Sequence, residues 1–423
     1  EHCFGRAKEI YGSIHHPDGN ETVYPENIFT VGHNGQDVRT GISAIHKLPY
    51  RGLLYRIRIG RNTWFEVTPW HRFLVADKRS QIPRYLRADQ LTPSTNYYLV
   101  APHGNVELGT RQWVHYELPR RWHNIPRRRE LNEALAYFIG FVLGDGTLTE
   151  IRHYGRTLRS VCLYPGHATP EPLIKLTQEL GLKPRHYLQR GQSIIYVLAE
   201  AFHIMKALKV PVGAKSRIID VPELIAKSPI SVISAFVAGF FDAEGNISEN
   251  GYNLRFATAS EKMADQLIVL LHYLGIRAHF SQAPYFSKTR RQRVLTYQVL
   301  VKAKSAYKLL HLIKPYLRLK SLPNISNEGR GKQQNRYIAA IETVPYEGFL
   351  YDFTTGTENY LAGKKGLTFI HNTHVQTTIS GRPFASMHGL LKGVAIDAEV
   401  TAFKVLGHLI GAGQTSYILR GLA

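Results

Sequence analysis

Two stretches of the sequence, "AYFIGFVLGDGTLTE" at residues 136–150 and "SAFVAGFFDAEGNIS" at 234–248, have the same order of apolar, small and acidic residues. Each contains a glycine five residues before an acid and another glycine directly after it, and the acids are Asp145 and Glu244. The apolar run before each acid is long enough for a helix. We therefore predict two equivalent helices that end at Asp145 and Glu244.

Small residues lie four positions apart in each predicted helix. They are Gly140 and Gly144 in the first helix, and Gly239 and Ala243 in the second. Residues with this spacing share a helix face, and small side chains there let two helix backbones approach closely. We predict that the helices pack along this face and bring their terminal acids side by side.

The similarity continues after both helices, so the two stretches belong to an internal repeat. The segment "TLRSVCLY" at 157–164 matches "NLRFATAS" at 253–260, which aligns Arg159 with Arg255. Each copy has the pattern of a helix, two strands, a helix and a further strand. Two such copies predict an α+β domain with a pseudo-twofold axis.

The predicted position of the two acids points to a chemical role. Two carboxylates held side by side repel each other unless a divalent cation neutralises them. Such a pair can bind Mg²⁺, which activates water for attack on a phosphodiester. An acid before glycine is more often a helix-end or turn residue, and for one copy alone we would favour that interpretation. Because both copies match, we interpret Asp145 and Glu244 as catalytic, metal-binding residues.

Short runs of alternating apolar and polar residues flank the repeat on both sides. They occupy residues 23–118, for example in "WFEVTPWHRFLVAD", and return beyond residue 335 in "GFLYDFTTGTENYLAG". Short alternating runs broken by Gly, Pro and Asn are typical of a compact β domain. We therefore predict a mixed architecture, in which an all-β domain is interrupted by the α+β domain.

The chain of 423 residues has a net charge of +21, from 53 Lys and Arg against 32 Asp and Glu. Such a surplus attracts polyanions, so we expect nucleic acid rather than a membrane as the partner. The cysteines, Cys3 and Cys162, have no metal-ligand spacing and exclude a disulfide framework. A long apolar run and a signal core are both missing from the sequence, so we expect a soluble, cytoplasmic protein.

The stretches "FIGFVLGDG" and "FVAGFFDAEG" resemble the paired motifs of the LAGLIDADG homing endonucleases. The resemblance covers residues 131–325, and Leu143 stands where the motif usually has its first Asp. It implies a saddle of two four-stranded sheets over DNA, with the motif helices as the central seam. It also implies Mg²⁺-dependent cleavage of a long, asymmetric double-stranded DNA site by a monomer.

The flanking β domain, residues 3–120 and 335–372, resembles the splicing domain of inteins, a fold shared with hedgehog autoprocessing domains. The motifs that carry this resemblance are "FEVTPWHRFLVAD", "LYDFTTGTENYLA" and "FIHNT", and Asn359 stands where many members have His. The residues that the resemblance implies as catalytic are Cys3, Thr68, His71, Asp352, His371, Asn372 and Thr373.

The implied reaction is protein splicing, which begins at Cys3. The Cys3 thiol attacks the preceding carbonyl and forms a thioester. Thr68 and His71 polarise that carbonyl and protonate the departing amine. Residues 1–2 are then a remnant of the host protein, and no cofactor is required.

The reaction ends at the His-Asn-Thr junction. The Thr373 hydroxyl takes over the thioester, and His371 assists Asn372, whose side-chain amide attacks its own backbone carbonyl and breaks the chain. A His-Asn-Thr triplet alone is more often part of a turn, so this interpretation depends on the other motifs. Residues 373–423 then belong to the host protein.

Basic residues gather in the stretch 121–130, which we predict as a linker, and in "SKTRRQR" at 287–293. Such stretches are usually solvated surface, but beside an endonuclease-like repeat we interpret them as phosphate contacts. The residues predicted to bind DNA are Arg120, Arg121, Arg127, Arg128, Arg129, Arg159, Arg255, Lys288, Arg290, Arg291 and Arg293.

Two other interpretations stay open. A DNA-binding or maturation protein of the same folds, with inactive splicing and cutting sites, would keep the charge and the repeat. A hedgehog-like domain that only cleaves the chain would not need the Asn372–Thr373 junction.

Overall fold

The computed structural model describes residues 2–59, 63–104, 106–119, 124–153, 156–249, 251–287, 292–322, 337–363, 365–372, 384–386 and 389–391. For residues 2, 3, 153, 156, 285–287, 292–294, 384–386 and 389–391 it describes the backbone alone. The chain divides into two compact units, which we describe separately. The first unit is residues 1–102, 335–363 and 367–423, and the second unit is residues 103–334 and 364–366.

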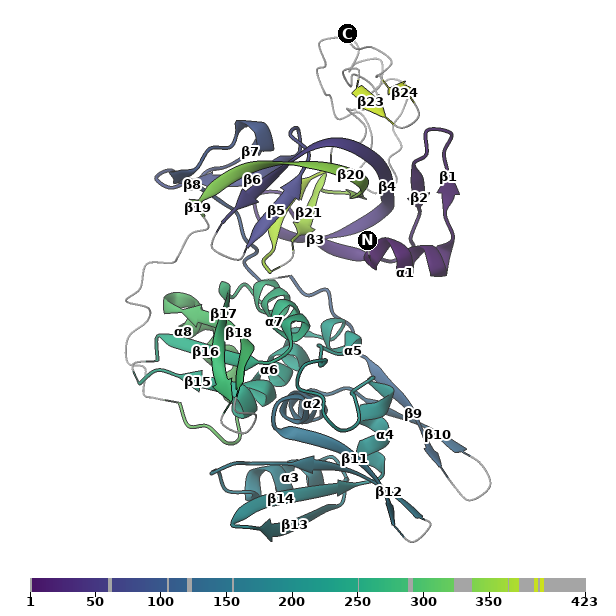
Figure 1. Cartoon of the computed structure of the whole chain (residues 1–423), viewed down its shortest axis with the longest axis vertical. Coiled ribbons are helices and arrows are strands. Elements are labelled where there is room, and N and C mark those ends of the chain that lie inside the picture. The colour runs from purple at the N-terminus through teal and green to yellow at the C-terminus, as the bar shows by residue number, and fades with distance from the viewer. Residues whose placement is uncertain are drawn as a thin grey trace. The chain divides into compact units, whose positions relative to one another are not determined.

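The first unit consists mainly of antiparallel strands (Figure 1). One sheet is built around β4 and β20, and another has the order β19-β8-β6-β22-β21 with β7 beside β6. The elements are α1 His2–Tyr11, β1 Ile14–His15, β2 Glu21–Val23, β3 Phe29–His33, β4 Asp37–Arg58, β5 Trp64–Val67, β6 Arg72–Asp77, β7 Pro83–Arg87, η1 Ala88–Gln90, β8 Ser94–Leu99, β19 Tyr337–Ile338, β20 Ala340–Thr355, β21 Asn359–Ala362, β22 Thr368–His371, β23 Phe384–Ser386 and β24 Gly389–Leu391.

Strands β4 and β20 form a long curved ribbon in the first unit (Figure 1). They carry the same local sequence, "LPYRGLLY" at 48–55 and "VPYEGFLY" at 344–351, paired so that each motif's first tyrosine faces the other motif's glycine. Both of these tyrosine hydroxyls donate to the carbonyl three residues on, at 2.9 Å. The twofold axis of this ribbon passes between Arg51 and Glu347, whose charged groups lie 3.5 Å apart.

Helix α1 departs from the all-β domain predicted for residues 3–120. Phe4 and Ala7, which are three residues apart, are buried, while Gly5 and Arg6 between them are exposed. Phe4 packs on the ring of Tyr351 in β20, at a centroid distance of 5.8 Å. A helix buries positions three apart on one face, whereas a strand would turn them to opposite faces.

The second unit contains both copies of the repeat, with α2 and α6 between two four-stranded sheets (Figure 1). The sheet orders are β11-β12-β14-β13 and β15-β16-β18-β17. The elements are β9 Trp113–Pro119, β10 Asn124–Glu130, α2 Glu133–Asp145, β11 Gly146–His153, β12 Arg156–Leu163, α3 Glu171–Glu179, β13 Pro184–Gln189, β14 Gln192–Leu198, α4 Glu200–Ala207, α5 Glu223–Ala226, α6 Ile230–Glu244, β15 Gly245–Ile247, β16 Asn253–Thr258, α7 Glu261–Tyr273, β17 Ala278–Ser287, β18 Gln292–Lys302, α8 Ala303–Ile313 and η2 Lys314–Tyr316.

Each repeat has one strand and one helix more than the predicted pattern. The observed order is helix, two strands, helix, two strands and a final helix. The strand missed in the first repeat is β13, which is exposed along most of its length and so lacks the alternation that predicts a strand. The final helices α4 and α8 pack their apolar faces into the core.

Helices α2 and α6 are in backbone contact along the small-residue face, as predicted. A Cβ on Gly140 would lie 2.2 Å from the carbonyl oxygen of Phe236, and one on Gly239 would lie 2.0 Å from that of Tyr137. Distances this short leave no room for a side chain. Both helices are buried on nearly all sides, within one apolar core that the two repeats share.

The second unit begins at His103, earlier than the boundary predicted at residue 120. Strand β9 pairs with β10 over residues 124–130, so the predicted linker is largely a strand. Val114 and Tyr116 alternate with exposed residues in β9 and join the core of the repeats. The Pro and Arg residues of β10 hid this, because an edge strand of a hairpin has little apolar surface to bury.

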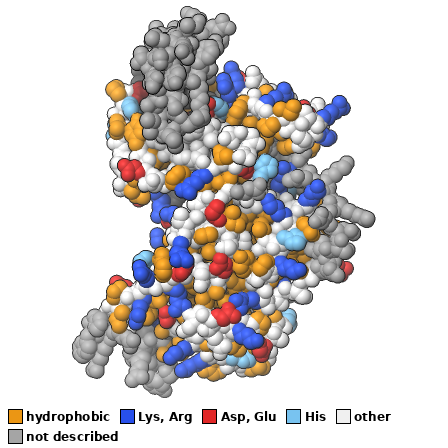
Figure 2. All heavy atoms as spheres, turned by 180° about the vertical axis from the view of Figure 1, so that it is seen from behind, with side chains coloured by type: hydrophobic (Ala, Val, Ile, Leu, Met, Phe, Trp, Pro, Cys, Tyr) orange, Lys and Arg blue, Asp and Glu red, His pale blue; other side chains and the backbone are white. Residues whose placement is uncertain are grey.

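Basic side chains are distributed over the described surface. On the face drawn in Figure 2, Lys and Arg side chains are interspersed with hydrophobic and acidic ones. None of the described helices has the length and apolar composition needed to span a bilayer.

Candidate functional site

Asp145 and Glu244 are the last residues of α2 and α6, and the helix packing brings them together. A Cβ on Gly144 would lie 3.0 Å from Cγ of Glu244 and 2.4 Å from Cβ of Ala243. The glycine after each acid is extended and begins a strand, β11 or β15. The two carboxylates therefore lie where the two sheets begin.

Two lysines that the sequence analysis did not single out lie at the same helix ends. Lys215 donates to two carbonyl oxygens in the last turn of α2, at 2.5 and 3.3 Å. Lys320 donates to two carbonyl oxygens near the end of α6, both at 2.7 Å. Cations are stabilised there because the last carbonyls of a helix have no partner within it. Each lysine follows the final helix of its repeat and precedes a serine, a repeated signal that could have identified both.

Burial shifts the ionisation of this cluster. Burial and the negative charge of Asp145 raise the pKa of Glu244 to about 7, although Lys215 and Lys320 oppose the shift. Burial also raises the pKa of Asp145, against the same two lysines. Burial lowers the pKa of Lys215 to about 8, while both carboxylates oppose that change. Near neutral pH, the cluster therefore contains groups that can gain or lose a proton.

A buried carboxylate in α6, that of Asp242, positions Lys320. It accepts hydrogen bonds from the backbone N–H groups of residues 318, 319 and 320 at 2.7–3.0 Å. It also accepts one from the hydroxyl of Tyr137 in α2, at 2.6 Å. The first repeat has the buried Leu143 at the matching position, which cannot hold Lys215 in this way.

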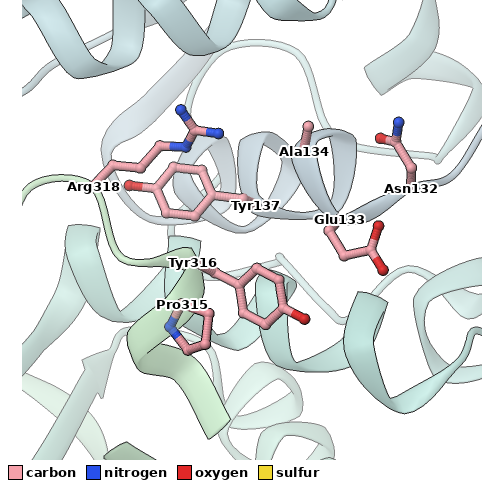
Figure 3. A pocket seen from close by; sticks show the side chains of 7 residues that line it. All are labelled: Asn132, Glu133, Ala134, Tyr137, Pro315, Tyr316 and Arg318. Carbon is pink, nitrogen blue, oxygen red and sulfur yellow. The ribbon is translucent and has the colours of Figure 1, made fainter. Parts of the chain in front are cut away.

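A pocket of about 290 Å³ lies beside Tyr137, between the start of α2 and residues 315–318 (Figure 3). The guanidinium of Arg318 lies over the Tyr137 ring, 5.6 Å from its centroid. Arg318 also forms an ion pair with Glu179 at 2.8 Å. These contacts hold the segment that leads to Lys320 against α2.

The acid pair has donors that suit Mg²⁺. This ion is commonly bound by one or two carboxylates, while waters and substrate phosphates complete its octahedral shell. In the described part of the chain, no group of three or more His, Cys, Asp or Glu side chains could hold a metal ion. Asp145 and Glu244 repel each other when both are ionised, and a cation between them relieves that repulsion. Two carboxylates fit a Mg²⁺ ion that is also bound by a substrate phosphate better than they fit an ion bound by protein side chains alone.

Arg159 and Arg255, aligned by the sequence repeat, lie on opposite faces of their sheets. Arg159 lies two residues before the core residue Val161 in β12, so both side chains are on the face that helices cover. Arg159 pairs with Glu150 at 2.9 Å and lies over the ring of Phe202 in α4. Arg255 alternates with core residues and faces the opposite way. By strand register, Arg255 is equivalent to Cys162. The repeat alignment was therefore wrong by three residues here, because it matched letters and not the pairing of each strand with its neighbour.

The basic hairpin β9–β10 contains three of the predicted DNA-binding arginines. Arg127 is exposed, Arg128 lies over the ring of Trp113 at 5.0 Å, and Arg129 pairs with Glu200 at 3.0 Å. The predicted contacts that fall outside the described residues are Arg120, Arg121, Lys288, Arg290 and Arg291, together with the side chain of Arg293.

In the first unit, strand pairing brings His71 and His371 into one region. Strand β22 pairs with β6 at Ile370 and Phe73, so the next antiparallel positions bring the end of β22 beside His71. The backbone N–H of His71 donates to the backbone carbonyl of Thr68 at 3.1 Å. The Nε2 atom of His71 is shielded from solvent and has no hydrogen-bond partner among the described residues.

Burial also decides the charge of this histidine pair. It lowers the pKa of His71. The charge of Asp352 opposes this shift, and the charge of His371 adds to it. Burial lowers the pKa of His371 as well. Asp352 accepts a hydrogen bond from the buried hydroxyl of Tyr360 at 2.7 Å. Both imidazoles are therefore neutral at pH 7 and able to accept a proton.

Asn372 is held at the end of β22. Its N–H donates to the carbonyl of Glu358 at 2.9 Å. When its side-chain amide is turned to match its neighbours, its nitrogen also faces that carbonyl and its oxygen accepts from the N–H of Thr355 at 3.3 Å. Nδ1 of His371 hydrogen-bonds the backbone carbonyl oxygen of Asn372. Thr373 and the side chain of Cys3 lie outside the described parts.

Asn359 connects several segments around this junction, a role that the sequence analysis did not predict. Its side chain accepts from the N–H of His33 at 2.6 Å and donates to the carbonyl of the same residue at 2.8 Å. It also donates to the hydroxyl of Tyr85 at 2.8 Å. The Tyr85 ring lies edge-on to His371 at 5.0 Å, so Asn359 supports the wall on which that imidazole rests.

The chain is similar to segments of larger proteins. It is 23% identical over 274 residues to the DNA polymerase of Thermococcus kodakarensis, which covers 58% of this chain and 16% of the polymerase. It is 23% identical over 398 residues to one polypeptide of the A-type ATP synthase of Pyrococcus horikoshii, which covers 88% of this chain and 38% of that polypeptide. The chain therefore spans a minor part of these relatives.

Among solved structures, the chain is similar to that of the homing endonuclease I-DmoI in complex with DNA and Mn. The identity is 18%, the TM-score is 0.31, and the match covers 43% of this chain and 97% of that one. Residues 231–314 match the model of the family described as LAGLIDADG-like domain. This match runs from α6 to α8, so it covers the second repeat.

Proposed function

We propose that the second unit is a Mg²⁺-dependent endonuclease that cleaves both strands of a specific double-stranded DNA. The observation that carries this proposal is the meeting of Asp145 and Glu244 at the ends of two helices in backbone contact. Two acids related by a pseudo-twofold axis match the two strands of a duplex, which are also related by twofold axes. The family match of residues 231–314 and the charge of +21 support a DNA substrate.

In this proposal each acid serves one DNA strand. Mg²⁺, when bound, supplies the Lewis acid that polarises the scissile phosphate and makes water a better nucleophile. Lys215 and Lys320 stabilise the negative charge that develops on the phosphate, since backbone carbonyls hold both ammonium groups in place. Glu244 has to be ionised to take part, and burial raises its pKa to about 7, so binding of Mg²⁺ competes with a proton there and strengthens as the pH rises.

The test uses plasmid cleavage with the variants Asp145→Asn and Glu244→Gln. The target is the host gene from which the coding sequence of residues 3–372 has been removed. We expect both variants to lose double-strand cleavage and to bind the target as tightly as the parent or more tightly, because repulsion between carboxylate and phosphate is relieved. Asp220→Asn, at a partly exposed acid paired with Lys262, is the control and should cut normally. Full cutting by both active-site variants would refute the proposal.

We also propose that the first unit performs protein splicing, which makes the chain an intein with an inserted endonuclease. The observation that carries this is the hydrogen bond of His371 to the Asn372 carbonyl, with the neutral His71 nearby. Segments similar to this chain are minor parts of a DNA polymerase and of an ATP synthase polypeptide. Such a segment, shared by proteins of unrelated activity, supports an insertion that removes itself.

The residues of the first unit divide the proposed reaction between them. The Cys3 sulfur replaces the amide nitrogen at the His2 carbonyl, and His71 with Thr68 assists departure of that nitrogen as an amine. The Thr373 oxygen then takes the acyl group and releases the thiol. The Asn372 amide nitrogen attacks its own carbonyl, which His371 polarises, so that a succinimide forms and the Thr373 amine is set free. That amine takes the acyl group from its own oxygen as a peptide.

Mass spectrometry of the freshly expressed chain tests splicing directly. The parent should release a fragment that ends at Asn372. Asn372→Ala should keep the tail attached but still allow thiol-induced cleavage before Cys3, and Cys3→Ala should stop that cleavage. Release before Cys3 without cleavage after Asn372 in the parent would instead favour the hedgehog-like alternative. An intact parent under all conditions would favour the inactive DNA-binding alternative.

A further inference from the structure

Each sheet of the second unit has one face packed against helices, and the opposite faces begin at the two acids. Side chains alternate along a strand, so residues between the core positions lie on the opposite face. The core positions are Leu148, Val161, Leu163, Ile195 and Val197 in the first sheet, and Leu254, Phe256, Val299 and Val301 in the second. A duplex whose phosphates reach Asp145 and Glu244 therefore extends along the two opposite faces, which we call the open faces.

Strand register gives the equivalent positions on the two open faces. Directly after the glycine that follows each acid, Thr147 faces Cys162 in the first sheet, and Asn246 faces Arg255 in the second. These two pairs are the innermost residues on their open faces. Their chemistry differs: one pair is small and uncharged, and the other is an amide beside a guanidinium.

The open face of the second sheet carries groups that can hydrogen-bond to base edges. Asn246 and Arg255 are both exposed. In the major groove, arginine binds the two acceptors of guanine and asparagine binds the donor and acceptor of adenine. One step further out, the exposed Asn253 faces the exposed Lys302. This face therefore suits a half-site that is read through purines.

The open face of the first sheet carries an exposed apolar pair further along β11 and β12. Ile151 faces Leu158 across β11 and β12, and these side chains are 56% and 57% exposed. Among the arginines whose side chains are described, Arg185 is the one on this face, and it lies on the far edge strand β13, three strands from the acid. Apolar side chains contact the 5-methyl group of thymine in the major groove. Exposed isoleucine and leucine on a face that meets DNA therefore suit a half-site rich in thymine.

We propose that the two repeats read the two halves of the target by different chemistry. The second repeat reads guanine and adenine through Arg255 and Asn246. The first repeat reads thymine methyl groups through Ile151 and Leu158. The inference rests on the proposed endonuclease function and adds the base class that each half-site requires.

The first experiment selects bound sequences from a randomised duplex library with the full chain and then replaces thymine by uracil. Uracil lacks only the methyl group. We expect uracil in the half-site under the first sheet to weaken binding about threefold to fourfold for each methyl contacted, and uracil in the other half-site to have no effect. Ile151→Ala with Leu158→Ala should abolish this sensitivity. Equal sensitivity of both half-sites would overturn the inference.

The second experiment compares Arg255→Ala with Arg159→Ala, which removes an arginine from the helix-covered face. Arg255→Ala should lose about tenfold of its discrimination at one guanine position, in the half-site that tolerates uracil. Arg159→Ala should keep the selected sequence, and Arg255→Lys should keep affinity better than discrimination. If Arg255→Ala weakens all sequences equally, the base assignment is wrong. If the parent selects no sequence at all, the endonuclease proposal itself fails.

Discussion

The hydroxyl of Tyr137 in the first repeat donates a 2.6 Å hydrogen bond to the carboxylate of Asp242 in the second. Burial and the charge of Asp242 raise the pKa of this phenol, so Tyr137 stays a donor throughout the ordinary pH range. The same carboxylate binds the backbone N–H groups up to Lys320. A polar contact between the repeats therefore fixes one of the two lysines beside the acids.

Tyr137→Phe removes this donor, and we expect it to slow cleavage by about tenfold without weakening DNA binding. The reason is that Asp242 loses a partner and holds Lys320 less firmly. Single-turnover cleavage and equilibrium binding measure the two effects separately. The pH dependence of the cleavage rate should also differ from that of the parent. Tyr116→Phe, which removes a hydrogen bond to Glu200, is the control. Equal losses in binding and cleavage would mean a general structural defect.

Glu244→Gln should stabilise the folded protein at pH 8 and leave it unchanged at pH 4.5. The folded pKa of Glu244 is raised to about 7, so the ionised form is disfavoured in the fold. Its stabilising contribution is present below its unfolded pKa of about 4.3 and is lost as pH rises to 7. The difference is about 3 kcal/mol. Urea unfolding at both pH values measures it, and a less stable variant at pH 8 would show that the lysines outweigh burial.

Gly239→Ala should destabilise the second unit by about 3 kcal/mol or more. The new Cβ would lie 2.0 Å from the Tyr137 carbonyl oxygen and 3.0 Å from the Phe141 nitrogen, so the helices have to separate. Gly41→Ala is the control, because its Cβ meets nothing within 4 Å. Thermal unfolding compares the two. Equal melting temperatures would mean that the helix contact is looser than described.

The first unit should lose stability in acid through its buried imidazoles. The folded pKa of His71 is lowered by burial, whereas the unfolded chain takes up the proton near pH 6.5. The contribution is therefore present above pH 6.5 and falls as the pH drops below it. We expect His71→Gln to flatten this dependence between pH 5 and about 7.5. The exposed His115 provides the matched variant, His115→Gln, which should not change it.

Binding to duplex DNA should weaken log-linearly with salt, at a slope near 0.9 per phosphate contacted. Arg127, exposed on β10, is a predicted phosphate contact. Arg127→Ala should lower the slope by about one and weaken all sequences alike. Fluorescence anisotropy from low to moderate salt measures this. An unchanged slope would place the β9–β10 hairpin away from the bound DNA.

The seam between the repeats was predictable because it depends on spacing alone. Gly140 and Gly239 are identified by periodicity, and the position of the following acids at the helix ends is then fixed by covalent geometry. Lys215 and Lys320 were missed because they reach the acids through tertiary packing, far from either motif in sequence. Their shared Lys-Ser context is visible only once the end of each repeat is known.

Predictions from the local sequence pattern were wrong where strand pairing decides which face a side chain lies on or whether a segment is a strand. Arg159 and Arg255 match as letters, yet an error of three residues in register, an odd number, turns them to opposite faces. Strand β10 was taken for a linker because its partner β9 supplies the buried side chains of the hairpin. Both errors concern strands, whose environment comes from neighbours and not from their own composition.

The pairing of β4 with β20 has a consequence for how this chain is made. Residues 103–334 of the second unit lie between them in sequence, so a ribosome exposes β4 long before its partner has been synthesised. Until then the edge of β4 that β20 covers, residues 42–58, is unpaired, and chains associate wrongly on surfaces of this kind. Each four-stranded sheet of the second unit takes all its strands from one repeat, so residues 103–334 can fold before β20 is made. The nascent first unit then closes last, by the slow capture of a distant strand.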